Sequence, residues 1–440
     1  MKLYVGIDLG STTTKAVVMD GESQTLGKGI TNSRSNYDTA CAIAKTEAFI
    51  DTRFSLFRQA LAGRGLPETL REGLLDSLSS DFRLQQFLRQ LNFLRESALE
   101  QADTPRNAEV RTEMRDKLEG LFSRILTEAR EWFRPGVARR SEFFRDLAGG
   151  AYMRLAEDFA DPDGVTYDRL VNIYDKCIIQ VENTMLDLSF EGNIAMALDT
   201  TLTEGIGGNG GTVDETARTA LHDSVQAVID TPLDIVNTVG TGYGRARLPF
   251  PKEQIRSEIL CHGLGAHHMF PHTATVLDIG GQDTKAIQVD NKGIVTSFQM
   301  NDRCAAGCGR YLGYIADELN LGVQELGPLA MKSDKSVRIN STCTVFAGAE
   351  LRERLNNGER QEDILQGLHR AIILRAMSLL ARSGGVEDEF TFTGGVANNQ
   401  AAVNALRGLV EENYGERILN ISSDSIYTGA VGAALFAHMN

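Results

Sequence analysis

This 440-residue sequence has no long apolar run, no net positive charge and few cysteines. No stretch approaches the roughly 20 apolar residues needed to cross a bilayer, so we expect no membrane span. The chain enters a strand pattern at its first residues, without the basic and apolar regions of a secretion signal, which predicts a cytoplasmic protein. The net charge of -14 argues against a nucleic-acid partner, because phosphate backbones are bound by clustered Lys and Arg.

Six cysteines are too few for a disulfide framework in so long a chain, so we expect free thiols or metal ligands. Cys41, Cys177 and Cys261 stand in helical patterns without paired spacing and are expected in the core. His262 and three further histidines, up to His272, lie near Cys261 and raise the alternative of a zinc site. Their spacing matches no standard four-ligand pattern, and we predict no metal there.

The sequence contains an internal duplication. The segment DLGSTTTKA at residues 8–16 recurs as DIGGQDTKA at residues 278–286. Each copy follows one apolar strand pattern, precedes a second, and then reaches a turn near Asp20 or Asp290. We therefore predict two related strand–turn–strand units in a globular chain of about two or three domains.

Each repeated turn places backbone N–H groups and small hydroxyls beside a carboxylate, which are the groups that bind a magnesium–nucleotide complex. A third glycine-rich turn, TGGVAN at residues 393–398, follows an apolar strand pattern and precedes a helical one. Its glycines allow close approach of a flat ligand such as adenine. A single turn of this kind is more often just a turn, but the ordered set of three predicts an ATP site.

Residues 49–203 have a different character, because apolar residues recur at helical spacing, as at Leu84, Phe87 and Leu91, and long stretches lack glycine. We expect a mostly helical block that is either a solvated subdomain laced with ion pairs or a docking surface for a partner subunit. The glycine-rich segment at residues 205–211 is expected to be a flexible linker, since no Lys-Ser or Lys-Thr completes a P-loop there.

Two cysteines directly precede helical patterns: Cys304 precedes the amphipathic pattern at residues 311–319, and Cys343 precedes the pattern that runs through Leu351 and Leu355. Helix N-termini favour the thiolate and stabilise an anionic metal cluster. A [4Fe–4S] cluster takes four thiolates, so two chains would complete it together. By residue type alone, the two cysteines could instead be buried and inert.

The three glycine-rich turns resemble those of the actin, Hsp70 and sugar-kinase ATPase superfamily. The resemblance implies an α/β fold with two ribonuclease-H-like (actin-like ATPase) domains and a large, mostly α-helical insertion in the first. The first ATPase domain would comprise residues 1–48 plus 204–273, the insertion 49–203, and the second ATPase domain 274–440. The implied cofactors are ATP and Mg²⁺, and the implied catalytic residues are Asp8, Asp278, Gln282 and Asp283. The implied cofactor-binding residues are Gly10, Ser11, Thr12, Thr13, Lys15, Gly280, Gly281, Gly394, Gly395 and Asn398.

The chain more closely resembles the ATPase subunits of benzoyl-CoA reductase and the activators of 2-hydroxyacyl-CoA dehydratases. The shared motifs are GIDLGST at residues 6–12, TGYGR at 241–245, DIGGQD at 278–283, the Cys304 segment, STCTVFA at 341–347 and GGVAN at 394–398. This resemblance implies that Cys304 and Cys343 ligate a [4Fe–4S] cluster shared across a subunit interface. Cys308 stands where the family usually has Thr, and it either packs or adds a third ligand.

The large insertion favours the large ATPase subunit of an ATP-dependent benzoyl-CoA reductase, since simple dehydratase activators are shorter. Such a subunit would pass electrons from ferredoxin, at the expense of ATP, to catalytic reductase subunits that dearomatise benzoyl-CoA in anaerobic degradation. Its partner would be a homologous second ATPase subunit, with a heterodimer favoured over a homodimer. The alternatives are a 2-hydroxyacyl-CoA dehydratase activator, a small-molecule kinase of the same superfamily and a nucleotide-gated binding module.

Overall fold

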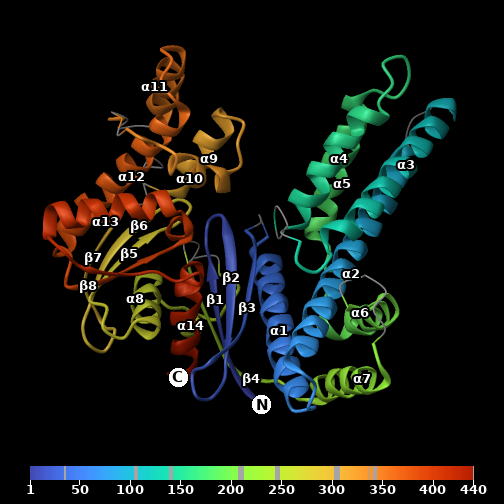
Figure 1. Cartoon of the computed structure of the whole chain (residues 1–440), viewed down its shortest axis with the longest axis horizontal. Helices are drawn as coiled ribbons and strands as arrows, with labels where there is room; N and C mark the ends of the chain where they lie inside the picture. The colour runs from blue at the N-terminus through green and yellow to red at the C-terminus, as the bar shows by residue number, and fades with distance from the viewer. Residues whose placement is uncertain are drawn as a thin grey trace. The chain divides into compact units, whose positions relative to one another are not determined.

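The computed structural model (Figure 1) describes residues 1–33, 36–103, 108–137, 141, 143–206, 213–242, 248–301, 308–335, 337–339 and 344–439. The chain forms two compact units. The helical unit comprises Met1 and Phe49–Leu233, and the α/β unit comprises Lys2–Ala48 and Asp234–Asn440.

The strands of the α/β unit are β1 (Lys2–Leu9), β2 (Thr13–Met19), β3 (Thr25–Asn32), β4 (Asp234–Gly242), β5 (Thr275–Ile279), β6 (Thr284–Val289), β7 (Val295–Asn301), β8 (Glu389–Thr393) and β9 (Ile418–Asn420). Its helices are α8 (Glu258–Met269), α9 (Gly309–Glu318), α10 (Val323–Ala330), α11 (Thr344–Asn356), α12 (Gln361–Ser383), α13 (Gln400–Tyr414) and α14 (Thr428–Met439), with short 3₁₀ turns η3 (Lys252–Gln254), η5 (Gly395–Asn398) and η6 (Ser425–Tyr427). Helix α1 (Tyr37–Ala62) begins in this unit and ends in the helical one.

Two sheets with the same plan form the α/β unit. Their strand orders are β3-β2-β1-β4 and β7-β6-β5-β8-β9. Each sheet begins with three consecutive antiparallel strands, β1 to β3 or β5 to β7. The first strand of each set also pairs in parallel with a strand from much later in the chain, β4 or β8. The duplication predicted from the sequence and the predicted α/β fold are therefore confirmed.

The repeat extends further than the sequence indicated, because a third strand follows in both copies. At the turn before β3, Asp20 Oδ1 accepts hydrogen bonds from the backbone N–H groups of Glu22 and Gln24. At the turn before β7, Asp290 Oδ1 accepts from Lys292 and from Ile294. A local side-chain bond of this kind stabilises a tight turn, so the same residue type closes both hairpins.

Helices α8 and α14 contact each other, and each packs on one of the two sheets. Val17 and Met19 of β2 bury against α14, whereas Val276 and Ile287 of the second sheet bury against α8. Helix α14 lies alongside β1 (Figure 1) at very short range, because a Cβ on Gly6 would overlap the backbone of α14. The pair of helices therefore holds the two repeats at a defined separation.

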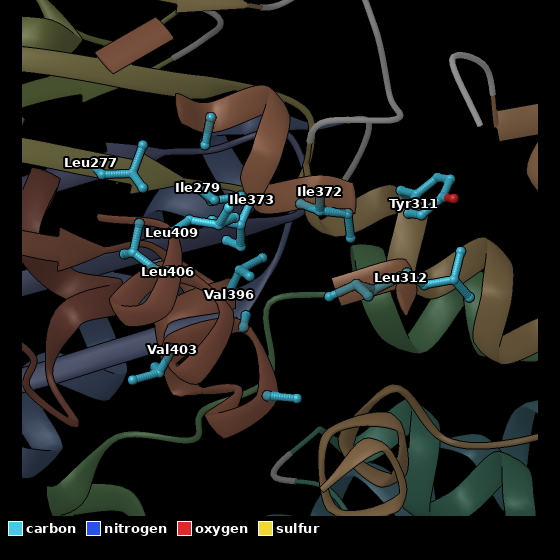
Figure 2. Packing of buried hydrophobic residues seen from close by; sticks show 14 of the residues in the cluster. Leu277, Ile279, Tyr311, Leu312, Ile372, Ile373, Val396, Val403, Leu406 and Leu409 are labelled. Atoms are coloured by element: carbon cyan, nitrogen blue, oxygen red, sulfur yellow. The ribbon is translucent and has the colours of Figure 1, made fainter. Parts of the chain in front are cut away.

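Helices α9 to α13 bury the main hydrophobic core of the second sheet. Figure 2 labels members of this core: Leu277, Ile279, Tyr311, Leu312, Ile372, Ile373, Val396, Val403, Leu406 and Leu409. Among the described helices, α12 alone is long and apolar enough to cross a membrane. One such helix is weak evidence for a membrane span, because a core helix of a soluble protein passes the same test. Most of α12 is buried inside the protein.

The helices of the helical unit are α2 (Glu68–Ala102), α3 (Ala108–Trp132), α4 (Phe144–Phe159), α5 (Tyr167–Asn183), α6 (Phe190–Glu204) and α7 (Glu215–Asp230). The 35-residue helix α2 runs through two hydrophobic clusters. Its first half packs with α1, α6 and α7, and its second half packs with α3, α4 and α5.

The predicted helical block is thus helical, but the compact unit continues beyond residue 203 to Leu233. The reason is that α7 buries Leu221 and Val225 in the same cluster as Phe190 of α6. The boundaries of the two ATPase domains, at residues 1–48 plus 204–273 and at 274–440, stay a proposal. The glycine-rich segment lies outside the described residues from position 207 to position 212.

Candidate functional site

A cleft of about 190 Å³ lies in the α/β unit, where the turns of the two repeats approach each other. The residues that line the cleft are Asp8, Gly10, Ser11, Thr12, Thr13, Lys15, Glu258, His262, Asp278, Gly280, Gly281, Asp283, Lys285, Gly394, Gly395 and Ile426.

The structure brings most of the residues named from the sequence to this cleft. Gln282 and Asn398 are absent from its lining, and Asn398 Oδ1 instead lies 3.5 Å from Ser425 Oγ. Cys304 and Cys343 lie outside the described residues. The roles given to all these side chains stay proposals.

The two repeats place the same pair of charged residues on facing strands. Asp8 at the end of β1 is the register partner of Lys15 on β2, with Nζ 3.7 Å from Oδ2. Asp278 on β5 is the register partner of Lys285 on β6, with Nζ 3.2 Å from Oδ2. Residues directly opposite in an antiparallel pair have adjacent side chains, so the local strand register alone produces both pairs.

Glycines let the three turns approach one another closely. A Cβ on Gly281 would overlap the Thr12 hydroxyl, so the phosphate loops proposed for the two repeats touch. Gly394 has φ of +84° and adjoins the backbone of Ile279, a conformation and a space that suit only glycine. The hydroxyl of Thr393 donates to Asp278 Oδ1 at 2.9 Å, which fixes the third turn to the second repeat.

Three charged or polar lining residues were not named as site residues from the sequence: Glu258, His262 and Lys285. Glu258 and His262 lie one helical turn apart at the start of α8, and their spacing of four residues is the signal that could have found them. Lys285 is 1% exposed, and its Nζ lies 2.9 Å from Glu258 Oε1 and 2.8 Å from Asp283 Oδ1. Lys285 could have been identified from the sequence, because it aligns with Lys15 in the repeat.

The buried charges perturb one another strongly. Burial alone would raise the pKa of Asp278, but His262 and Lys285 outweigh burial and hold that pKa well below its usual range. Burial would lower the pKa of Lys285, but its carboxylate neighbours raise it well above the ordinary value. The pKa of Glu258 is raised, because burial and the nearby acidic groups outweigh the attraction of Lys285.

The donor set fits a divalent cation accompanied by phosphates. Four carboxylates, those of Asp8, Glu258, Asp278 and Asp283, face the two ammonium groups of Lys15 and Lys285. Asp8 Oδ1 is buried and accepts no hydrogen bond from any described residue. An unpaired buried carboxylate oxygen is costly, and a bound cation removes that cost.

The second phosphate loop is hydrogen-bonded to the start of α9. The N–H groups of Gly309 and Arg310 donate to the carbonyl oxygens of Gly280 and Gly281, both at 2.8 Å. Helix α9 begins just after Cys308, which is buried and follows the Cys304 segment in the chain. The loop and this helix therefore share backbone contacts.

Cys41, Cys177 and Cys261 are buried free thiols, as expected for core residues. Burial raises the pKa of Cys41 to about 12, of Cys177 to about 11 and of Cys261 to about 12. These three thiols therefore stay protonated at neutral pH.

Two sheets of one plan, with a ligand cleft between their turns, define the actin-like and sugar-kinase class of ATPase folds. A solved structure of the activator of 2-hydroxyisocaproyl-CoA dehydratase from Clostridium difficile, with bound ADPNP, has this fold: the TM-score is 0.51 at 22% identity, and the match covers 99% of this chain and 94% of that one. The chain belongs to the BadF/BadG/BcrA/BcrD ATPase family, whose model matches residues 5–437.

Two kinds of relative within this family differ in their similarity to the chain. The (R)-2-hydroxyglutaryl-CoA dehydratase activating ATPase of Acidaminococcus fermentans is 45% identical over 205 residues, which is 47% of this chain and 76% of that protein. A benzoyl-CoA reductase subunit of Thauera aromatica is 31% identical over 204 residues, which is 46% of this chain and 71% of that protein.

Proposed function

We propose that the chain is an ATP-hydrolysing activator of a 2-hydroxyacyl-CoA dehydratase. The observation that carries this proposal is its 45% identity to a dehydratase-activating ATPase, against 31% to a benzoyl-CoA reductase subunit. The sequence had favoured the reductase subunit because of the insertion. That role is the second candidate, since the helical unit of Phe49–Leu233 distinguishes this chain from a simple activator.

Bound Mg-ATP would supply free energy by hydrolysis, and a [4Fe–4S] cluster on Cys304 and Cys343 would supply the electron. In the α/β unit, Asp8 and Asp278 would hold the cation. The loops at residues 10–13 and 280–283 offer backbone N–H groups to the phosphates. Gly394 and Gly395 leave room for the adenosine.

The hydrogen bonds from Gly309 and Arg310 to the second phosphate loop support a link between ATP and the cysteine segment. A displacement of Gly280 and Gly281 toward the phosphates pulls on the first turn of α9. Because this helix follows directly after the Cys304 segment in the chain, the displacement acts on the residues proposed to hold the cluster.

An activator with two cluster cysteines needs a second chain to complete four thiolates. A second copy of this chain is the simplest source in a dehydratase activator, whereas a reductase would use a homologous second subunit. Ferredoxin is the proposed electron donor in both cases, and the acyl-CoA enzyme is the acceptor. The helical unit is either a solvated subdomain or the surface that docks one of these partners.

An activation assay under strict anaerobiosis tests the proposal. The purified chain is mixed with ATP, Mg²⁺ and reduced ferredoxin, and then either with a dehydratase and 2-hydroxyacyl-CoA substrates or with reductase catalytic subunits and benzoyl-CoA. ATP-dependent loss of water from a 2-hydroxyacyl-CoA, abolished by Asp8→Asn, supports the activator. ATP-dependent consumption of benzoyl-CoA alone supports the second candidate, and iron-free protein that phosphorylates a small molecule contradicts both.

A further inference from the structure

We propose that Asp8, Glu258 and His262 form a binding site for a divalent transition-metal ion that the chain holds without nucleotide. One ligand atom from each of the three residues lies within 4.8 Å of the other two, and all three residues are buried. They come from β1 and from the first two turns of α8.

Two polar atoms at this position have no partner among the described residues. Asp8 Oδ1 and His262 Nε2 are buried and form no hydrogen bond with any residue that the structure describes. His262 is only 5% exposed and Asp8 only 3%. Buried polar groups are almost always hydrogen-bonded, so two unpaired atoms in one cluster indicate a ligand.

The neighbours of His262 prepare one of its ring nitrogens to bind a metal. Nδ1 lies 3.3 Å from Asp278 Oδ1, so the carboxylate attracts a proton on this nitrogen. A carboxylate beside one ring nitrogen keeps the proton there and leaves the lone pair on the other nitrogen. Asp278 therefore orients His262 with Nε2 free.

The cleft supplies space for an ion, because Asp8, Glu258 and His262 all line it, and Gly429 packs closely against this site. A Cβ at Gly429 would lie 2.7 Å from His262 Nε2 and 3.0 Å from Asp8 Oδ2. Gly429 lies in the first turn of α14, where its backbone φ is not in the left-handed region, so the turn itself does not require glycine. The missing side chain lets α14 approach the histidine and the aspartate closely.

The lysines leave ligand oxygens available. Lys285 Nζ contacts Glu258 Oε1 at 2.9 Å, and Lys15 Nζ lies 3.7 Å from Asp8 Oδ2, so Glu258 Oε2 and Asp8 Oδ1 remain for the ion. One imidazole with two carboxylates suits Mn²⁺, Fe²⁺ or Zn²⁺, whereas Mg²⁺ prefers oxygen ligands and water.

This site goes beyond the Mg²⁺ of the proposed function, which arrives with the nucleotide. It also does not depend on which acyl-CoA enzyme the chain serves, because metal binding can be measured without ATP, iron or a partner. A failed activation assay and a failed metal-binding assay are therefore separate results.

The test is Mn²⁺ binding to the full-length chain after treatment with a chelator and removal of nucleotide, followed by electron paramagnetic resonance. We expect a single class of bound Mn²⁺ with hyperfine coupling to an imidazole nitrogen. His262→Gln removes the nitrogen coupling and weakens Mn²⁺ affinity by at least about tenfold. His268→Gln is the matched control, because His268 is exposed on the same helix and its loss leaves affinity unchanged.

Gly429→Ala keeps all three ligands, but its added methyl group would overlap His262 and Asp8 and displace them, so it should also weaken Mn²⁺ binding by about tenfold or more. The nitrogen coupling is measured on the unmodified chain, so the test stands even where a variant fails to fold. Bound Mn²⁺ without nitrogen coupling overturns the proposal. Mn²⁺ that binds only after ATP is added overturns it as well, because the ion is then held by the nucleotide.

Discussion

Lys285 and Asp278 face each other across strands β6 and β5, with the lysine Nζ 3.2 Å from the aspartate Oδ2. The same ammonium contacts Asp283 and Glu258, so it balances carboxylates from a strand, a turn and a helix. In the first repeat, Lys15 lies 3.7 Å from Asp8. The duplication has kept the charged pair in both copies, and the second copy has built a larger network around it.

Lys285→Met is expected to lower the free energy of unfolding by about 3–5 kcal/mol, because it leaves buried carboxylates without a counter-charge. Urea denaturation measured by circular dichroism gives this difference. Lys15→Met is the matched variant in the first repeat and should cost less, since Lys15 is more exposed and its pair is longer. Equal losses in the two variants would contradict the difference between the repeats.

Gly6→Ala is expected to destabilise the protein by about 1–3 kcal/mol, because its Cβ would overlap the backbone of α14 at Ala430 and Ala434. Thermal unfolding measures the loss. Gly21→Ala serves as the control, because a Cβ there meets nothing within 4 Å, and its effect should stay within about 0.5 kcal/mol. A stable Gly6→Ala variant would show that α14 can move away from β1.

Gly281→Ala is expected to weaken binding of an ATP analogue by about tenfold or more, because the added methyl group displaces Thr12 and separates the two proposed phosphate loops. Isothermal titration calorimetry measures the affinity. Gly408→Ala on α13 is the control, since a Cβ there has open space. Unchanged affinity in the Gly281 variant would mean that the loops need not touch to hold the nucleotide.

His369 should make stability depend on pH. Burial lowers its pKa, while Nδ1 bonds to the carbonyl of Leu365 and Nε2 accepts from Asn399 Nδ2. Because the folded pKa is below the unfolded value of about 6.5, the stabilisation is complete above that pH and is lost as pH falls, with a slope of up to about 1.4 kcal/mol per pH unit. His369→Gln should reduce this slope in denaturant titrations between about pH 6.5 and 5. An unchanged slope would assign the dependence to other groups.

Cys308→Ala is expected to leave the iron content unchanged, because Cys308 is 1% exposed at the start of α9. Iron and acid-labile sulfide are measured on anaerobically purified protein. Cys304→Ala and Cys343→Ala are the comparison, and each should lose the roughly two irons per chain of a shared cluster. Loss of iron in the Cys308 variant would make this residue a ligand instead of a packing residue.

The sequence by itself determined the features that depend on short stretches of chain. The repeated strands, the turns at Asp20 and Asp290 and the glycine-rich third turn follow from local patterns, and the structure shows all of them. The pairing of Asp8 with Lys15, and of Asp278 with Lys285, also follows from local register, because each pair spans a single turn. The cysteine pair was recognised in the same way, but it lies outside the described residues.

Only the tertiary structure decided what surrounds those carboxylates. Glu258 and His262 reach the cleft because α8 packs against α14 and the second sheet, a contact between segments far apart in the chain. The histidines near Cys261 had matched no metal pattern, because Asp8, a candidate co-ligand, lies near the N-terminus and far from them in the sequence. Similarly, α7 joins the helical unit through side chains buried against α6, which no local pattern could reveal. Local periodicity predicts elements, but the burial of charged side chains together depends on how distant elements pack.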